Sequence, residues 1–153
     1  MAAIEIAALS DGAAGELLTL QRAAYVTEAQ LYDDVRLRAL VQSLDELTEE
    51  LTTSRCLAAL AGTRLVGAVR SREEDGVLHV GRLVVAPDVQ GWGVGTRLLT
   101  AAEQSTRLHR ATLFTGHRSV ANLRLYERHG YRESRRERVH PGLELVHLDK
   151  RLS

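Results

Sequence analysis

Gln90-Gly91-Trp92-Gly93-Val94-Gly95-Thr96 decides the fold of this chain, because it separates two segments of different periodicity. The apolar run Leu83-Val84-Val85 comes before it, and an amphipathic stretch from about Val94 to Arg107 follows it. The sequence therefore predicts a strand, a tight loop and the start of a helix. Glycines let such a loop bring its N–H groups close to a ligand, and the helix start adds unpaired N–H groups, so phosphate or pyrophosphate is the favoured ligand. An ordinary glycine-rich turn is the alternative.

The positions of the glycines narrow the choice of phosphate ligand. A dinucleotide fingerprint, Gly-x-Gly-x-x-Gly/Ala, would place its last residue at Thr96 or at Leu98, and neither is small enough. A nucleotide triphosphate loop would end in Gly-Lys-Ser/Thr, which this segment lacks. A nucleotide-binding dehydrogenase is therefore disfavoured. The pattern Gln-x-x-Gly-x-Gly does fit, and it resembles the CoA pyrophosphate loop of the GNAT superfamily of acyl-CoA N-acyltransferases.

A second segment supports the resemblance: Asn122-Leu123-Arg124-Leu125-Tyr126-Glu127-Arg128-His129-Gly130-Tyr131. It is similar to the family's helix from Asn to Tyr, followed by Gly and an aromatic residue. The spacing puts Asn122 and Tyr126 on one helix face, and Gly130 suits the left-handed position that ends a helix. The resemblance covers roughly residues 55 to 135, and the flanking segments match only in general pattern.

Hydrophobic spacing and turn residues predict the other elements. We expect a strand from Ile4 to Leu9, a helix capped by Ser10-Asp11 that ends at about Ala24, and a helix from the capping box Ser43-Leu44-Asp45-Glu46 to about Leu51, with residues 26–41 ambiguous. Three antiparallel strands (56–60, 65–70, 77–85), a helix (94–107), a strand (111–115), a helix (119–129) and two strands around Pro141-Gly142 follow.

This order of elements and the resemblance together imply an α/β (α+β) fold of three layers. A mixed, mostly antiparallel central sheet of about seven strands is flanked by about four helices. We expect residues 1–153 to form a single GNAT-like N-acetyltransferase domain.

Composition and charge exclude several other classes of protein. Cys56 is the only cysteine, which excludes an internal disulfide and a cysteine-based zinc site, and we expect it to be a buried small hydrophobe. No metal is expected. The 20 basic and 20 acidic residues balance, with acids gathered early and arginines late, which argues against a uniformly basic nucleic-acid surface.

The terminal segments predict location and assembly. Met1 to Ile6 carries no basic leader region, and the longest apolar run, near Cys56 to Ala61, is too short to cross a bilayer. We therefore expect a cytoplasmic protein without a membrane partner. The last strands offer edges that a second copy could cover, which favours a homodimer.

The resemblance also implies where acetyl-CoA binds. The thioester would lie in a splay between strand 77–85 and strand 111–115, where unpaired backbone groups receive the pantetheine arm. The Leu83 N–H would stabilise the thioester oxyanion, and Val85 would serve pantetheine, although plain core packing is the alternative for both side chains. The full set of implied acetyl-CoA contacts is Leu83, Val84, Val85, Gln90, Gly91, Trp92, Gly93, Val94, Gly95, Thr96, Asn122 and Tyr126.

Direct attack of an amine on the thioester requires an acid and a base. Tyr126 is the candidate acid for the departing thiolate, because a phenol keeps its proton at neutral pH until the thiolate forms. Packing of its ring under the sheet is the alternative. His79 is the candidate base, although many family members place a glutamate at this position, and a histidine that only covers the sheet is an equal alternative.

Three other features each have two interpretations. Asn122 either binds the pantetheine arm or caps the helix after Ser119. Trp92 either stacks on the cofactor or is only an exposed aromatic residue. The late arginines, which are Arg132, Arg135, Arg136 and Arg138, could reach the ribose phosphate. The alternation of Arg132, Ser134, Arg136 and Arg138 instead favours a solvated strand face.

The amine acceptor is the least determined part. Tyr25 and Glu28 are the predicted substrate-binding residues, in the early helical region that the family uses for the acceptor, and Glu28 is a second candidate base. Glu28, Asp33 and Asp34 hint at a cationic amine, and small-molecule and peptide amines both remain open. The predicted function is transfer of an acetyl group from acetyl-CoA to a primary amine. The alternative is a non-catalytic acyl-CoA-binding sensor or interaction module.

Overall fold

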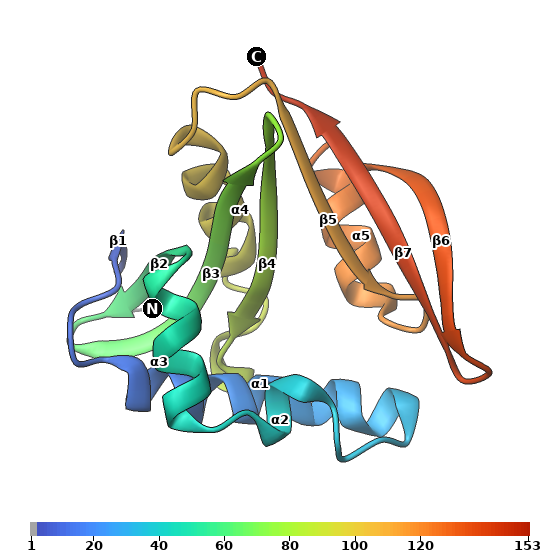
Figure 1. Cartoon of the computed structure of the whole chain (residues 1–153). Coiled ribbons are helices and arrows are strands. Elements are labelled where there is room, and N and C mark those ends of the chain that lie inside the picture. Colours follow the sequence, from blue (N-terminus) through green and yellow to red (C-terminus); the bar gives the residue numbers. More distant parts are fainter. Residues whose placement is uncertain (1–2) are drawn as a thin grey trace.

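A seven-stranded sheet organises the computed structural model, which describes residues 3–153 (Figure 1). Met1 and Ala2, where the predicted domain begins, lie outside the described residues. The strands are β1 (Ile4–Ala8), β2 (Arg55–Ala61), β3 (Arg64–Glu74), β4 (Val77–Val85), β5 (Arg110–Gly116), β6 (Arg132–His140) and β7 (Leu143–Arg151). The helices are α1 (Ala14–Tyr32), α2 (Arg38–Val41), α3 (Leu44–Thr52), α4 (Val94–Gln104) and α5 (Val120–Arg128), with a 3-10 turn, η1 (Pro87–Val89). The predicted fold class is confirmed, with five helices in the described chain instead of about four.

The sheet is split between β4 and β5. Its strand order is β1-β2-β3-β4-β5-β7-β6, and every neighbouring pair is antiparallel except β4 and β5. These two strands pair only through Leu78 with Ala111 and His79 with Thr112. Past His79 they diverge, as the wedge between them in Figure 1 shows. The edge of β4 that faces β5 therefore has no strand partner from Val80 to Val85, which agrees with the predicted splay.

The helices lie on both faces of the sheet. A Cβ on Gly67 of β3 would meet Val94 of α4 at 2.8 Å, so this face of β3 packs on α4. Arg70 lies three residues along the strand and points to the opposite face. There its guanidinium donates to Gln21 of α1 at 3.2 Å and to Glu50 of α3 at 3.1 Å. The sheet is thus the middle of three layers.

The prediction for the first helix was wrong at both ends. Its N-cap is Ala13 and no side chain caps it, so Ser10 and Asp11 do not serve as caps. It does not end near Ala24 but continues to Tyr32, where Asp33 adopts a left-handed conformation with φ 49°. Hydrogen bonds of Tyr32 and Glu28 with the distant Ser119 stabilise the extension, and the local sequence pattern could not predict them.

The remaining boundaries need smaller corrections. The capping box of α3 is confirmed, because Ser43 Oγ accepts from the Glu46 N–H and Glu46 accepts from the Ser43 N–H. The ambiguous segment contains an additional short helix, α2, so three helices precede β2 instead of two. Helix α4 ends at Gln104, before the predicted Arg107.

The contact between α1 and the end of β5 depends on Gly116. A Cβ at this position would lie 2.0 Å from the Tyr32 hydroxyl, which bonds to Ser119 Oγ at 2.8 Å and accepts from the Arg118 N–H at 3.0 Å. We therefore expect Gly116→Ala to reduce the free energy of unfolding by about 2 kcal/mol, since overpacking forces the helix to move. Chemical denaturation measures this loss. Gly15→Ala, at an α1 position with no neighbour within 4 Å, is the control and should be neutral or slightly stabilising.

Candidate active site

The glycine loop leads into a helix whose first turn has no side-chain cap. Gly91 and Gly93 adopt φ values of 87° and 79°, a region that residues with a Cβ rarely enter. Gly93 is the N-cap of α4, and no side chain bonds to the N–H groups of the first turn. The first N–H of this helix to find a backbone acceptor is that of Arg97, which donates to Gly93. The N–H groups from Val94 to Thr96 therefore remain available to an anion, and the helix dipole favours negative charge there.

Gly95 has a different function from the other two glycines. Its backbone is ordinary, but a Cβ there would approach Leu125 of α5 at 3.2 Å and Leu83 of β4 at 3.8 Å. The absence of a side chain lets α4 begin beside the open edge of β4 and beside α5. The loop, the split and α5 thus converge at one point of the molecule.

A β-bulge shapes the open edge of β4. Between the pairs Ala68 with Val84 and Arg70 with Gly81, β3 contributes one residue and β4 contributes two, Arg82 and Leu83. Arg82 adopts the left-handed conformation with φ 50°. Leu83 and Val85 are half-buried, whereas Val84 is buried. The bulge belongs to the ladder with β3, and it redirects the side chains of β4. The opposite edge of β4 has no partner in β5 past His79, so it offers backbone groups to a ligand.

Helix α5 carries Tyr126 into the core of the molecule. The helix ends as predicted at Gly130, with φ 96°, where the Tyr131 N–H donates to the Tyr126 carbonyl and the Gly130 N–H donates to Glu127. Tyr126 is 6% exposed. Burial, with smaller effects of Tyr25 and Glu28, raises the pKa of the Tyr126 phenol far above its ordinary value. Tyr25 and Glu28 belong to α1, so the hydroxyl of Tyr126 lies near the helix on the other side of the split.

Tyr131 provides a contrast with Tyr126. Its hydroxyl donates to Glu103 of α4 at 2.9 Å, and Lys150 of β7 donates to the same carboxylate at 2.8 Å. The Tyr126 hydroxyl has no hydrogen-bond partner within residues 3–153, and it is not among the fully buried unpartnered atoms there. Tyr131 therefore links α4, α5 and β7, whereas Tyr126 keeps a free hydroxyl.

Of the other predicted site residues, two make side-chain hydrogen bonds and three expose their side chains on the glycine loop. Asn122 does not cap α5, which begins after Ser119, because its amide donates to Thr115 Oγ1 of β5 at 3.3 Å. Glu28 is not a solvated carboxylate, since it accepts a hydrogen bond from Ser119 Oγ. Trp92, Gln90 and Thr96 are exposed along the loop.

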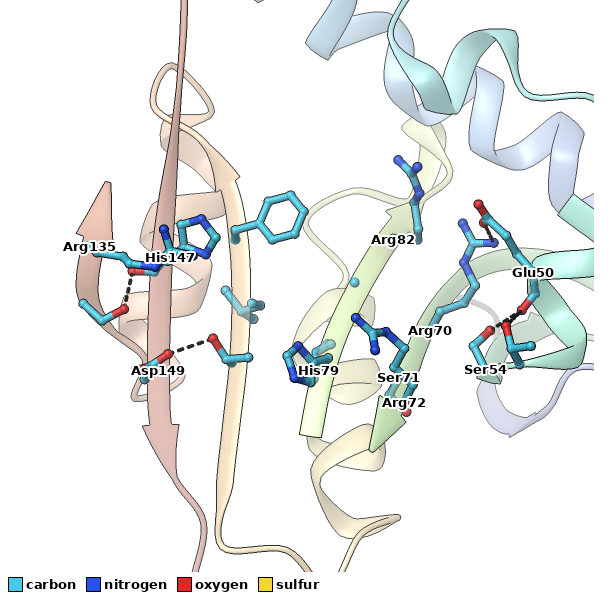
Figure 2. Close-up of a pocket in the computed structure, with 17 residues that line it drawn as sticks. Glu50, Ser54, Arg70, Ser71, Arg72, His79, Arg82, Arg135, His147 and Asp149 are labelled. Atoms are coloured by element: carbon cyan, nitrogen blue, oxygen red, sulfur yellow. Dashed lines mark hydrogen bonds and ion pairs between the residues drawn. The ribbon is translucent and has the colours of Figure 1, made fainter. Parts of the chain in front are cut away.

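A cavity of about 720 Å³ opens on the face of the split opposite α4 (Figure 2). Both sides of the split line it, through His79 to Arg82 of β4 and Thr112 to Phe114 of β5. Of the predicted site residues it contains His79, whereas Tyr25, Glu28 and Tyr126 lie outside its lining. No hydrogen bond or ion pair within the described chain joins His79 to Tyr126. The structure thus brings Tyr126, Tyr25 and Glu28 together and leaves His79 in the cavity.

The sequence pattern missed Arg82 as a residue of this cavity. Arg70, Arg72 and Arg135 line it as well. The late arginines were predicted to form a solvated strand face, and all nine residues of β6 are indeed exposed. Arg82 had no signal in the sequence, because an arginine in a left-handed bulge looks like any polar residue of a strand.

Cys56 is half-buried against the core, so the prediction of a buried residue was only partly right. Burial raises the pKa of its thiol to about 11. The thiol therefore stays protonated at neutral pH and is a poor nucleophile.

Residues 26–152 match the family model described as an acetyltransferase (GNAT) domain. The chain belongs to the GNAT acetyltransferase family. GNAT members are acetyl-CoA-binding acetyltransferases. The match includes the glycine loop, the split and α5, and it begins within α1.

Many solved GNAT structures share the fold. PaiA N-acetyltransferase from Thermoplasma acidophilum, solved with coenzyme A, is 19% identical, with a TM-score of 0.77 over 97% of this chain and 99% of that one. The ribosomal-protein-S18-alanine N-acetyltransferase from Escherichia coli is 14% identical, with a TM-score of 0.80 over 99% and 95%. A GNAT family acetyltransferase from Elizabethkingia anophelis with acetyl-CoA bound is 17% identical, with a TM-score of 0.75 over 97% and 98%. No curated protein sequence matches the chain. Among residues 3–153, no helix has the length and apolar character needed to span a membrane.

Proposed function

We propose that residues 1–153 form one N-acetyltransferase domain that transfers the acetyl group of acetyl-CoA to a primary amine by direct attack. One observation carries this proposal: the uncapped first turn of α4 lies beside the unpaired edge of β4. An anion site next to an open strand edge fits the pyrophosphate and the pantetheine arm of one ligand. Family membership supports the same co-substrate.

The residues of the split are suited to hold that co-substrate. The N–H groups from Val94 to Thr96 would bind the pyrophosphate, with Gln90 and Gly91 in the same loop. The open edge from Leu83 to Val85 would pair with the pantetheine amides. Asn122 uses its amide nitrogen on Thr115, so its amide oxygen is left to accept from the pantetheine arm.

Three groups would supply the chemistry. The Leu83 N–H, in the bulge, would donate to the oxygen on which negative charge develops during attack. His79, on the cavity side of the split, would accept the proton of the amine directly or through water. Tyr126 would donate its proton to the leaving thiolate. Desolvation raises the proton affinity of a buried thiolate as it raises that of the buried phenol, so the transfer remains feasible.

Heat stabilisation by acetyl-CoA is the expected result that tests this binding. A ligand at a hundred times its dissociation constant adds about 2.7 kcal/mol, which for a chain of this size raises Tm by about 5 to 10 °C. Thermal unfolding with and without acetyl-CoA measures the shift. S-acetylpantetheine, which lacks the pyrophosphate, is the control and should give a much smaller shift at equal concentration. Stabilisation by NAD in place of acetyl-CoA would contradict the proposal.

A further inference from the structure

The cavity on the open face of the split carries an excess of positive charge. Four arginines line it, together with His79 and His147, against two carboxylates, Glu50 and Asp149. Both carboxylates are engaged: Glu50 pairs with Arg38 and Arg70 at 3.1 Å each, and Asp149 accepts from Thr112 Oγ1 at 2.7 Å and faces Arg110 at 3.6 Å. The acids that line the cavity are therefore not free to bind a cation.

Three of the four arginines also have acidic partners. Arg70 pairs with Glu50, Arg72 pairs with Glu74, and Arg135 lies 3.9 Å from Glu137. The side chain of Arg82 makes no ion pair and no hydrogen bond within residues 3–153, and in Figure 2 it stands apart from every dashed line. Of the four arginines it is the one without an ion pair in the described chain. Its charge contributes to the lowered pKa of Glu50, but that carboxylate is already paired with Arg70 and Arg38.

The backbone and one aromatic ring hold Arg82 in place. The bulge sets its left-handed conformation and so aims its side chain away from the strand ladder. Its guanidinium lies over the Tyr25 ring, 5.9 Å from the ring centre. A cation at this position is attracted to the π-electrons of the ring face. The positive charge of Arg82 also acts on Arg70, whose pKa is lowered by burial first and then by Arg82. Glu50 is near both guanidinium groups and pairs with Arg70, and one carboxylate against two guanidinium groups leaves a net positive charge.

From this geometry we infer that the acceptor of the proposed acetyl transfer is a primary amine that also carries an anionic group, a carboxylate or a phosphate, which Arg82 binds. The inference rests on the proposed function. A guanidinium binds either anion through two parallel hydrogen bonds, which a compact ammonium group cannot do. Arg82 also neighbours Leu83, the residue proposed to contact the thioester, so an amine anchored on Arg82 lies beside the reacting carbonyl. This assignment replaces the cationic amine that Glu28, Asp33 and Asp34 suggested, since none of these three lines the cavity.

Matched pairs of amines test the inference. The pairs are phenylalanine with phenethylamine, lysine with cadaverine, and O-phosphoethanolamine with ethanolamine, each measured for kcat/KM with the full chain and acetyl-CoA. In at least one pair we expect kcat/KM to be about tenfold or more higher for the member that carries the anion. Whether this pair contains a carboxylate or a phosphate shows which anion Arg82 binds. Arg82→Asn, which tolerates the left-handed backbone, should lower kcat/KM for that member about 10- to 100-fold and leave its neutral or cationic counterpart nearly unchanged. Arg82→Lys should recover only part of the loss.

The outcomes separate this inference from the function on which it rests. The inference would be overturned if the wild-type chain acetylated the amines without an anion equally well or better. That result would still agree with the proposed acetyltransferase function. An equal loss for both members of a pair in Arg82→Asn would also overturn the inference, because it would indicate general damage to the site. Acetyl-CoA binding without acetylation of any amine would count against the proposed function itself.

Discussion

Tyr126→Phe is expected to lower kcat for acetyl transfer by about 100-fold or more, the range typical of a lost general acid. The ring of Tyr126 is buried, and its hydroxyl bonds to nothing within residues 3–153. Its loss should therefore leave the fold and the affinity for acetyl-CoA unchanged. Initial rates of thiol release at saturating acetyl-CoA, together with Tm in the presence and absence of the ligand, measure both quantities.

Tyr131→Phe is the matched control for this prediction. The two rings lie 6.2 Å apart and both are buried, but Tyr131 donates to Glu103. Removing that hydroxyl should reduce the free energy of unfolding by about 1 to 3 kcal/mol, because Glu103 loses one of its donors, and kcat should not change. Wild-type turnover in Tyr126→Phe, or an equal loss of turnover in both variants, would rule out the acid role of Tyr126.

Gly95→Val is expected to weaken acetyl-CoA binding by about 100-fold, or about 2.7 kcal/mol. A side chain at this position points at Leu125, Leu83 and Val85, and so enters the space where the pantetheine arm would meet the helix start. At a ligand concentration that stabilises the wild type by about 2.7 kcal/mol, the variant should gain only about 0.4 kcal/mol. Ligand-dependent thermal unfolding measures this difference.

Gly15→Val controls for the substitution itself. Gly15 and Gly95 are both the second residue of a helix, but a Cβ on Gly15 meets nothing within 4 Å. We expect that variant to keep the full response to acetyl-CoA. Adding Leu125→Ala to Gly95→Val removes the nearest clashing atom and separates damage to the fold from blockage of the site. Full ligand affinity in that stable double variant would mean that acetyl-CoA does not bind at this junction.

The sequence was sufficient where local rules determine the structure. The glycines predicted the tight loop, in which Gly91 and Gly93 adopt positive φ, Gly130 ended α5, and the spacing of Ser43 and Glu46 formed a capping box. These features depend on residues within one turn of each other. The order of elements around them followed from hydrophobic spacing, whereas the split of the sheet was expected only from the resemblance to the GNAT family.

Features fixed by distant contacts could not be predicted. Helix α1 reaches Tyr32 because that side chain bonds to Ser119, which lies 87 positions away, and a local pattern cannot report this contact. The bulge at Arg82 depends on how β4 pairs with β3, and a non-glycine residue with positive φ leaves no mark in the sequence. The proposed acceptor side of the site depends on that bulge and on α1, so sequence patterns alone do not predict it.

Amine-dependent release of CoA thiol from acetyl-CoA tests the proposed transfer most directly. Cys56 should not disturb the measurement, because its pKa of about 11 keeps it protonated and slow to react with a thiol reagent. We predict that thiol release requires both the chain and an amine, and that each released thiol is matched by one N-acetylated amine in mass spectrometry. Heat stabilisation by acetyl-CoA without thiol release for any amine would contradict the transfer and favour a non-catalytic acyl-CoA-binding sensor.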